Sequence, residues 1–201
     1  MDSGEVAYCN RLIDNFMQSC PKDLPTIKER EKDAEGEKEK ENETETEKEG
    51  YDRVAALRRE KMEMEARTLM LSNARIRKVG VDTLTQKLSE IGKFILCLDL
   101  SNNRLTELSP IFSAITFPFI KKLNLRSNQF RQFPEEISTL TTLTELRLSN
   151  NGLFGMLSPL IGKLTNLITL DLSFNSLTDL PPEVCPTSPP PNNISHASLN
   201  N

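Results

Sequence analysis

The chain has 201 residues, of which 37% are apolar and 27% are charged, with a formal net charge of −4. This length accommodates one domain of ordinary size with flanking segments, and no run of about 18 apolar residues predicts a membrane-spanning helix. General nucleic-acid binding is excluded, because phosphate neutralisation needs clustered Lys and Arg that the sequence does not provide.

Residues 1–20 show the apolar periodicity of an amphipathic helix. Two interpretations are open for the apolar stripe of this helix: it packs against an exposed end of the domain that follows, or it lies in the groove of a partner. Pro21 then ends the segment. The stripe consists of Val6, Cys9, Ile13, Phe16 and Cys20, at three- and four-residue steps.

A charged low-complexity tract follows over residues 21–50, where every odd position from Glu29 to Glu49 is acidic. Such a stretch buries too little apolar surface to offset the entropy of ordering, so we predict a disordered or fraying helical linker. An acidic docking site for a basic partner is the alternative. The pattern becomes helical again over residues 51–65, and its place directly before the repeats predicts a helix that caps the first of them.

Residues 66–184 contain an internal repeat. Four segments fit the pattern L-x-x-L-x-L-x-x-N-x-L, with Ile or Phe allowed at the leucine places, and a fifth, earlier copy has Ala74 in place of the Asn. The five copies start at residues 66, 95, 120, 143 and 167, so that successive starts are 29, 25, 23 and 24 residues apart. A nearly constant period of this size is typical of leucine-rich repeats.

Each place in the repeat has a physical reason. The alternating leucines come from a short strand, whose period of two sends both side chains to one face. The Asn stands where the chain turns away from the strand, and its amide satisfies backbone groups that would otherwise be buried unpaired. The asparagines of this turn column are Asn103, Asn128, Asn151 and Asn175.

No repeat buries its apolar face alone, so the fold requires stacking of neighbours. We predict an α/β solenoid of about five repeats, with a parallel sheet of short strands on its concave face, helical N-terminal segments and disordered flanks. The C-terminal flank is the Pro/Asn/Ser-rich tail at 185–201. A last repeat without a cap leaves an open apolar layer, which favours self-association or a shortened form of a longer array over a tail folded across the end.

Two segments carry a family resemblance: FRQFPEEISTLTTLTELRLSNN at 130–151 and LTNLITLDLSFNSLTDLPPEV at 164–184. They resemble the intracellular leucine-rich-repeat proteins of the Ras-suppressor and scribble group, and the similarity covers about half of the chain. The resemblance implies a right-handed, curved leucine-rich-repeat solenoid whose parallel inner sheet serves as a binding scaffold.

Strand residues between the leucines point outward, and equivalent positions of adjacent strands form columns about 4.8 Å apart. Arg and aromatic side chains are enriched in binding hot spots, so Arg147 and Phe174 are the predicted anchors of a partner-binding surface. The alternative is a set of solvated ion pairs between neighbouring strands, Lys122 with Glu145 and Arg147 with Asp171. The complete predicted surface comprises Asp99, Lys122, Asn124, Arg126, Glu145, Arg147, Asp171 and Phe174.

The sequence offers no catalytic constellation. Its single histidine, His196, lies in the tail, and no phosphate-binding loop, nucleophile elbow or dinucleotide fingerprint is present. We therefore predict a protein-interaction module that acts as a scaffold or adaptor in signalling and is not an enzyme. A regulatory or targeting subunit of a separate phosphatase, kinase or ubiquitin ligase is the alternative.

The cysteines show no metal-ligand spacing, so we expect no metal and no cofactor. The first twenty residues contain early acidic residues and no continuous apolar run, which does not resemble a signal peptide. We therefore expect a reducing compartment, the cytoplasm, with the nucleus as the alternative. The four cysteines are Cys9, Cys20, Cys97 and Cys185.

Overall fold

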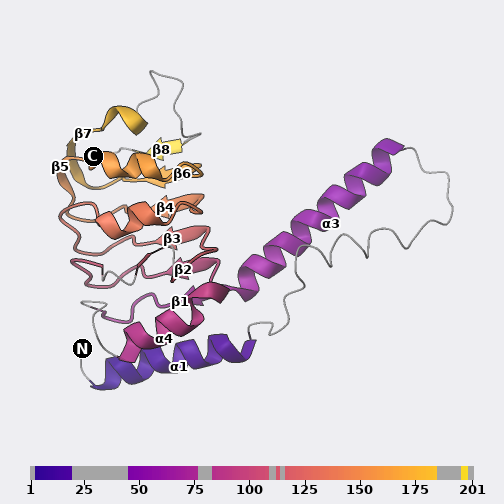
Figure 1. The fold of residues 1–201 in the computed structure, drawn as a ribbon, viewed down its shortest axis with the longest axis horizontal. Helices are drawn as coiled ribbons and strands as arrows, with labels where there is room; N and C mark the ends of the chain where they lie inside the picture. Colours follow the sequence, from indigo (N-terminus) through magenta and orange to yellow (C-terminus); the bar gives the residue numbers. More distant parts are fainter. Residues whose placement is uncertain are drawn as a thin grey trace.

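The computed structural model describes residues 3–19, 45–76, 83–108, 112–113, 116–184 and 196–198. It confirms the predicted solenoid, in which short strands stack into one sheet and the connecting chain returns along the opposite side (Figure 1). Among the described helices, none combines the length and the apolar character needed to cross a bilayer.

The main sheet has six strands in the order β1-β2-β3-β4-β6-β8, and every neighbouring pair is parallel. The pairing register aligns the first inward leucine of each repeat with that of the next. The strands are β1 Thr68–Met70, β2 Cys97–Asp99, β3 Lys122–Asn124, β4 Glu145–Arg147, β6 Thr169–Asp171 and β8 His196–Ser198.

A second, two-stranded parallel sheet pairs β5 Phe154–Met156 with β7 Ser176–Asp179. It lies away from the main sheet (Figure 1), and the sequence analysis did not predict it. Short 3-10 helices complete the repeats: η2 Gly92–Phe94, η3 Glu135–Thr139, η4 Pro159–Lys163 and η5 Pro182–Val184.

One continuous apolar core runs through the stack, from the N-terminal helices to Val184. Burying a leucine side chain contributes about 1.5–3 kcal/mol relative to leaving it exposed, so these columns supply much of the driving force for stacking. The two inward leucines of every complete repeat are at most 1% exposed: Leu69 and Leu71, Leu98 and Leu100, Leu123 and Leu125, Leu146 and Leu148, Leu170 and Leu172.

Helices α1 (Ser3–Ser19) and α4 (Thr83–Ile91) pack against each other at the N-terminal end of the stack, where α1 also contacts β1 (Figure 1). The stripe of α1 therefore folds back on the first repeat, which was one of its two interpretations. The side chains of Val6 and Cys20 lie outside the described part of the chain. The described members of the stripe are at most 5% exposed: Cys9, Ile13 and Phe16.

Helix α3 (Glu45–Ala66) begins inside the segment 21–50, for which we predicted a disordered or fraying helical linker. Glu and Lys are good helix formers, and extending an existing helix costs less than nucleating one. The structure corrects the cap predicted at 51–65. Helix α3 projects away from the stack (Figure 1), and Leu57 is 64% exposed, so α1 and α4 provide the cap instead.

The tail predicted to be disordered at 185–201 contains β8, which pairs with β6. The prediction is therefore wrong for residues 196–198. An unpaired strand edge exposes backbone N–H and C=O groups that pair readily with another strand, and here the chain's own tail supplies that strand. The other residues of the tail lie outside the described ranges, and the predicted self-association stays a prediction.

Candidate functional site

The asparagine column fixes the turn that ends each strand. The side-chain amide of Asn128 donates to the carbonyls of Leu100 at 3.0 Å, Leu125 at 3.0 Å and Arg126 at 3.3 Å. Its side-chain oxygen accepts from the backbone N–H of Leu105 at 3.1 Å. Leu100 and Leu105 belong to the preceding repeat, so this one side chain joins two repeats.

The same bonds recur at the other asparagines, each of which reaches the preceding repeat. The first repeat has no preceding repeat to reach. Buried Ala74 can therefore replace the Asn there without leaving a backbone group of a preceding repeat unpaired. The carbonyl acceptors in the preceding repeats are Leu71 for Asn103, Leu125 for Asn151 and Leu148 for Asn175.

The outward strand positions form the two columns that the repeat pattern predicts, because the strands pair in register. Most of the proposed binding residues thereby stand on one face of the sheet. The first column contains Thr68, Cys97, Lys122, Glu145 and Thr169, and the second contains Met70, Asp99, Asn124, Arg147 and Asp171.

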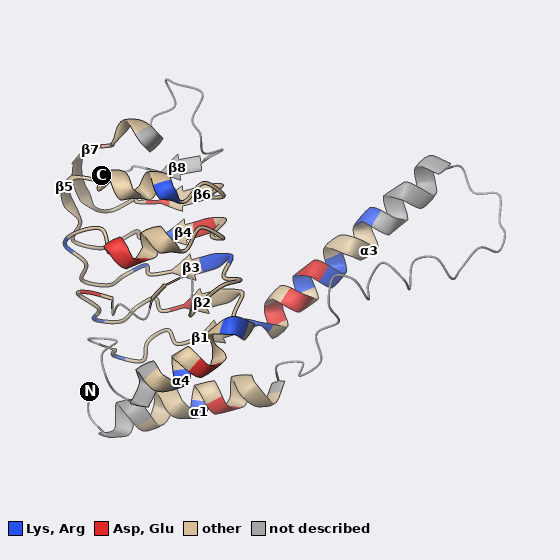
Figure 2. Cartoon of the chain, in the orientation of Figure 1, with Lys and Arg blue, Asp and Glu red and all other residues tan. Residues whose placement is uncertain are grey.

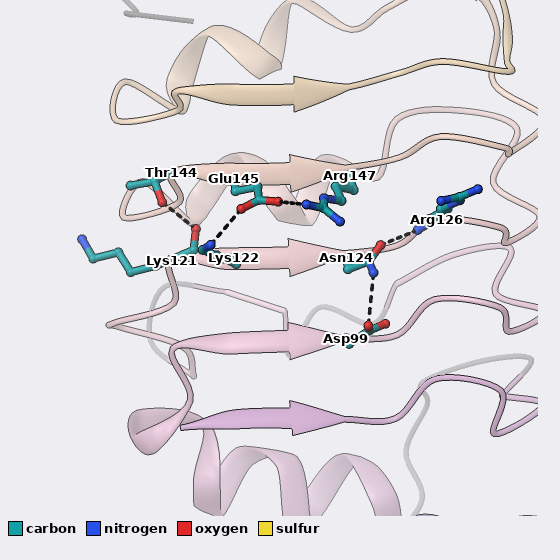
Figure 3. Close-up of polar contacts among 8 residues, drawn as sticks. All are labelled: Asp99, Lys121, Lys122, Asn124, Arg126, Thr144, Glu145 and Arg147. Carbon is teal, nitrogen blue, oxygen red and sulfur yellow. Dashed lines mark hydrogen bonds and ion pairs between the residues drawn. The ribbon is translucent and has the colours of Figure 1, made fainter. Parts of the chain in front are cut away.

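Glu145 is the centre of an ionic network on this face (Figure 3). Its two carboxylate oxygens contact the ammonium of Lys122 at 3.1 Å and the guanidinium of Arg147 at 2.6 Å. The Glu145 side chain is only 17% exposed, whereas those of Lys122 and Arg147 are 45% and 52% exposed. The two cations therefore lie on the solvent side of a carboxylate that both of them neutralise.

This network corrects one expected ion pair. Lys122 pairs with Glu145 across strands as predicted, but Arg147 pairs with Glu145 of its own strand and not with Asp171. Residues two apart on a strand share a face, which brings Arg147 within reach of Glu145. The Asp171 carboxylate instead accepts from the hydroxyl of Ser173 at 2.6 Å and from its backbone N–H at 3.1 Å.

The pKa of Asp171 is lowered from its ordinary value. Burial acts to raise it, but the hydrogen bonds from Ser173, the nearby hydroxyl of Ser149 and the charge of Arg147 together outweigh that effect. Asp171 is therefore a carboxylate at neutral pH, and it presents a negative charge beside Arg147.

A series of hydrogen bonds lies beside the ionic network (Figure 3). Asp99 accepts from the side-chain amide of Asn124 at 3.2 Å and from the backbone N–H of Ser101 at 2.8 Å. Asn124 accepts in turn from the backbone N–H of Arg126 at 3.1 Å. These bonds orient Asp99 and Asn124, while the Arg126 side chain is exposed at the border of the face.

A hollow of about 660 Å³ separates the C-terminal half of α3 from strands β1 to β4. Charged residues stand on both of its sides (Figure 2). It brings together five of the predicted binding residues, but it does not include Arg126, Asp171 or Phe174. The five are Asp99, Lys122, Asn124, Glu145 and Arg147.

The contribution of α3 to this hollow was missing from the sequence prediction. Leu57 and Met64 are seven residues apart and so share one helix face, a signal that the analysis had assigned to a cap. With Met70 of β1, which is 53% exposed, they form the apolar part of the lining of the hollow. The remaining residues that α3 contributes are Glu60, Lys61 and Glu65.

The direction of α3 is set by contacts at its C-terminal end. The Arg67 guanidinium, whose residue is 6% exposed, donates to the carbonyl of Phe94 at 2.6 Å and contacts the carboxylate of Glu63 at 3.4 Å. The hydroxyl of Thr68 donates to the carbonyl of Met64 at 2.6 Å. These bonds tie the last turn of α3 to β1 and to the end of η2, and they hold the hollow open.

Cys97 lies in the hollow with a thiol of low reactivity. Burial raises its pKa and outweighs the lowering effects of a hydrogen bond to Thr68 and the charge of Lys122, while Glu145 raises it further. The thiol is therefore protonated at neutral pH, and a protonated thiol is a weak nucleophile.

Phe174 stands at the edge of the face in a left-handed backbone conformation, with φ of 56°. The equivalent positions in the other turns are Asn73, Asn102, Ser127 and Asn150, and all have φ between 53° and 57°. Asn tolerates this conformation, whereas it strains a bulky side chain. The Phe174 side chain is also 63% exposed, so the core offers it little packing in return.

Phe174→Asn is therefore expected to stabilise the protein, by about 0.5–1 kcal/mol, because Asn relieves strain of the order of 1 kcal/mol. Thermal and urea unfolding of the two proteins measure the difference. Asn150→Phe, the reverse change one repeat earlier, is the matched control and should destabilise by a similar amount. Unchanged stability in both variants would contradict the assigned strain.

Comparison with known proteins agrees with this architecture. The Leucine Rich Repeat family model matches residues 95–115, 142–164 and 166–187. Over these residues the chain is similar to that family, and the repeats, the parallel sheet and the asparagine turns show a leucine-rich-repeat solenoid.

Several curated proteins are similar to part of the chain. An adenylate cyclase from Podospora anserina is 40% identical over 43% of this chain and 4% of its own length. The Ras guanine nucleotide exchange factor V of Dictyostelium discoideum is 36% identical over 50% of this chain and 6% of its own length. Human podocan-like protein 1 is 34% identical over 57% of this chain and 22% of its own length. The chain thus spans less than a quarter of each of these relatives.

Solved structures of repeat proteins are also similar. The ectodomain of the receptor kinase SOBIR1 from Arabidopsis thaliana is 25% identical, with a TM-score of 0.47, and the match covers 66% of this chain and 67% of that one.

Proposed function

We propose that the chain is a protein-interaction module that acts as an intracellular scaffold or adaptor in signalling. Leucine-rich-repeat domains are in general protein-interaction modules. The observation that supports this role most directly is the hollow between α3 and β1 to β4, which charged and exposed apolar side chains line together. We place the module in the cytoplasm and assign it no catalytic activity of its own.

The chemistry of the hollow suits a protein partner. Leu57 and Met70 are each more than half exposed and lose contact with water when a partner covers them. The network around Glu145 has its charges partly balanced already, which lowers the cost of desolvating it. An apolar side next to a hydrogen-bonding side is the usual anatomy of a protein interface.

The signalling role is supported by resemblance. The repeats resemble those of the Ras-suppressor and scribble group, and one relative is a Ras guanine nucleotide exchange factor. The alternative proposal is that the chain is a regulatory or targeting subunit of a separate phosphatase, kinase or ubiquitin ligase. The identity of the captured partner distinguishes the two forms.

Arg147→Ala and Phe174→Asn are each expected to weaken partner binding by about 30-fold, the effect of losing a hot-spot contact worth 2 kcal/mol. Affinity capture followed by mass spectrometry identifies the partner, and a binding titration with the purified partner measures the loss. Lys163→Ala, an exposed cation of η4 outside the hollow, is the control and should bind like wild type. If both test variants keep full affinity, the proposal that this surface binds the partner is wrong.

A further inference from the structure

Most of the charged side chains that line the hollow between α3 and β1 to β4 are paired with one another. The Glu145 carboxylate binds two cations, and a lysine and a glutamate of α3 lie 4.0 Å apart across one helical turn. Among the described residues, two carboxylates of the lining are left without a cation: Asp99 on β2 and Glu60 on α3. One of them is contributed by the sheet and the other by the helix.

Asp99 is oriented by donors that carry no charge. Its two carboxylate oxygens accept from the backbone N–H of Ser101 at 2.8 Å and from the side-chain amide of Asn124 at 3.2 Å (Figure 3). These bonds set the direction of the carboxylate but leave its negative charge in place. Asp99 is also half-buried, and a cation interacts more strongly with a charge that is partly withdrawn from water than with a fully exposed one.

The same hollow offers apolar surface for the stem of a long side chain. Leu57 and Met64 of α3 and Met70 of β1 belong to its lining. Lysine and arginine bury their methylene stems along apolar surface while their charged ends reach an acceptor, and methionine adapts its shape to such a stem. A lining that combines aliphatic side chains with two carboxylates that lack a cation is therefore complementary to a basic side chain.

We propose that the hollow takes up a basic segment of a protein partner, with an arginine or lysine side chain that Asp99 and Glu60 neutralise. This inference rests on the proposed function and narrows it, because it names the chemistry of the segment that binds. The cation would contact both α3 and β2, two elements whose arrangement the bonds of Arg67 and Thr68 hold. An acidic side chain in the same place would meet two like charges.

The charge requirement is tested on the full chain with two short synthetic peptides that are acetylated and amidated at their ends. The first contains one arginine among alanines and leucines. In the second, citrulline, a neutral side chain of similar shape, replaces the arginine. We expect the arginine peptide to bind more tightly, by a margin that shrinks as the salt concentration rises, because salt screens charges. Equal binding of the two peptides overturns the proposal.

Methionine methyl resonances show where the peptide binds. Met64 and Met70 line the hollow, whereas Met62 of the same helix is 70% exposed and does not belong to the lining. In a protein with labelled methionine methyl groups, the arginine peptide is expected to shift the resonances of Met64 and Met70 and to leave that of Met62 in place. Shifts as large at Met62 as at the other two, or no shift at any of them, contradict binding in the hollow.

Two variants remove the charges while nearly keeping the shapes of the side chains. Asp99→Asn, which keeps an acceptor for Ser101, and Glu60→Gln are each expected to lower affinity for the arginine peptide about threefold, and together about tenfold, the effect of losing partly exposed ion pairs. Glu135→Gln, the same loss of charge at an exposed residue of η3 outside the hollow, is the control and should bind like wild type. Unchanged affinity of the double variant shows that the proposal is wrong.

The peptide experiments need no natural partner, so their failure and the failure of the proposed function are distinguishable. If the two peptides bind equally while Arg147→Ala still weakens binding of the captured partner, the interaction module is retained and the basic segment is rejected. If the arginine peptide binds as expected while Arg147→Ala and Phe174→Asn keep full affinity for the captured partner, the preference of the hollow for a cation is retained and the proposed partner-binding surface is rejected.

Discussion

Asn128→Ala is expected to lower the free energy of unfolding by about 2–4 kcal/mol, because a buried hydrogen-bonding group without a partner costs about 1–3 kcal/mol and the truncation also leaves a cavity. The carbonyl of Leu100 keeps the amide of Asn103 as a donor, and that of Leu125 keeps Asn151. The backbone N–H of Leu105 loses the side-chain oxygen of Asn128, which is the acceptor to which it donates. Chemical denaturation, read as a shift in the midpoint, measures the effect.

Two comparisons make this result specific. Asn128→Asp keeps an acceptor for Leu105 but directs a carboxylate at carbonyl oxygens, so it should destabilise at least as much as the alanine variant. Asn166→Ala removes one exposed hydrogen bond to the carbonyl of Thr141 and should cost less than about 1 kcal/mol. If Asn128→Ala and Asn166→Ala were equally mild, the asparagine column would have no structural importance.

Gly92→Ala is expected to destabilise the protein by about 3 kcal/mol or more, at the upper end of what overpacking a core costs. A Cβ atom on Gly92 would lie 2.1 Å from the carbonyl oxygen of Thr116 and 3.0 Å from its carbonyl carbon. Both are backbone atoms, so relief requires movement of a chain segment and not only of a flexible side chain. Thermal unfolding and the yield of soluble protein report the loss.

Gly152→Ala is the matched control for this substitution. A Cβ atom there would meet the carbonyl oxygen of Phe130 at 3.4 Å, an ordinary contact distance. Its cost should stay below about 1 kcal/mol, within the range of mild substitutions. A Gly92→Ala protein as stable as the Gly152→Ala protein would show that the close approach of η2 to Thr116 is not maintained in solution.

The repeats could be predicted from the sequence because their information is local. A strand of period two followed by an Asn turn needs only about a dozen residues to be recognised, and recurrence fixes the stacking. The outward columns, and hence the positions of Lys122 and Glu145, follow from that register. The ion pair of Arg147 did not follow, because Glu145 on its own strand and Asp171 on the next strand were both within reach of its side chain.

The elements that escaped prediction depend on contacts outside the repeat. The direction of α3 is set by the buried Arg67 guanidinium, whose acceptor Phe94 is 27 residues away. The pairing of β8 depends on the free edge of β6, and the three residues of β8, His-Ala-Ser, include no leucine that would indicate a strand. Phe174 was recognised as an exposed aromatic residue, but its left-handed backbone is a property of the turn that only coordinates show.

The asparagine bonds give the assembly a polarity that its stacked strands alone lack. Every amide of the column reaches toward the N-terminus, so a newly synthesised unit finds its acceptors already in place. When repeats unfold from the C-terminal end, the Asn amides of the remaining repeats keep their acceptors. When repeats unfold from the N-terminal end, each step leaves the Asn amide of the next repeat without its acceptor in the preceding repeat. We therefore expect vectorial assembly during translation and fraying that starts far from the α1–α4 cap, an order that pulse-labelling hydrogen exchange resolves.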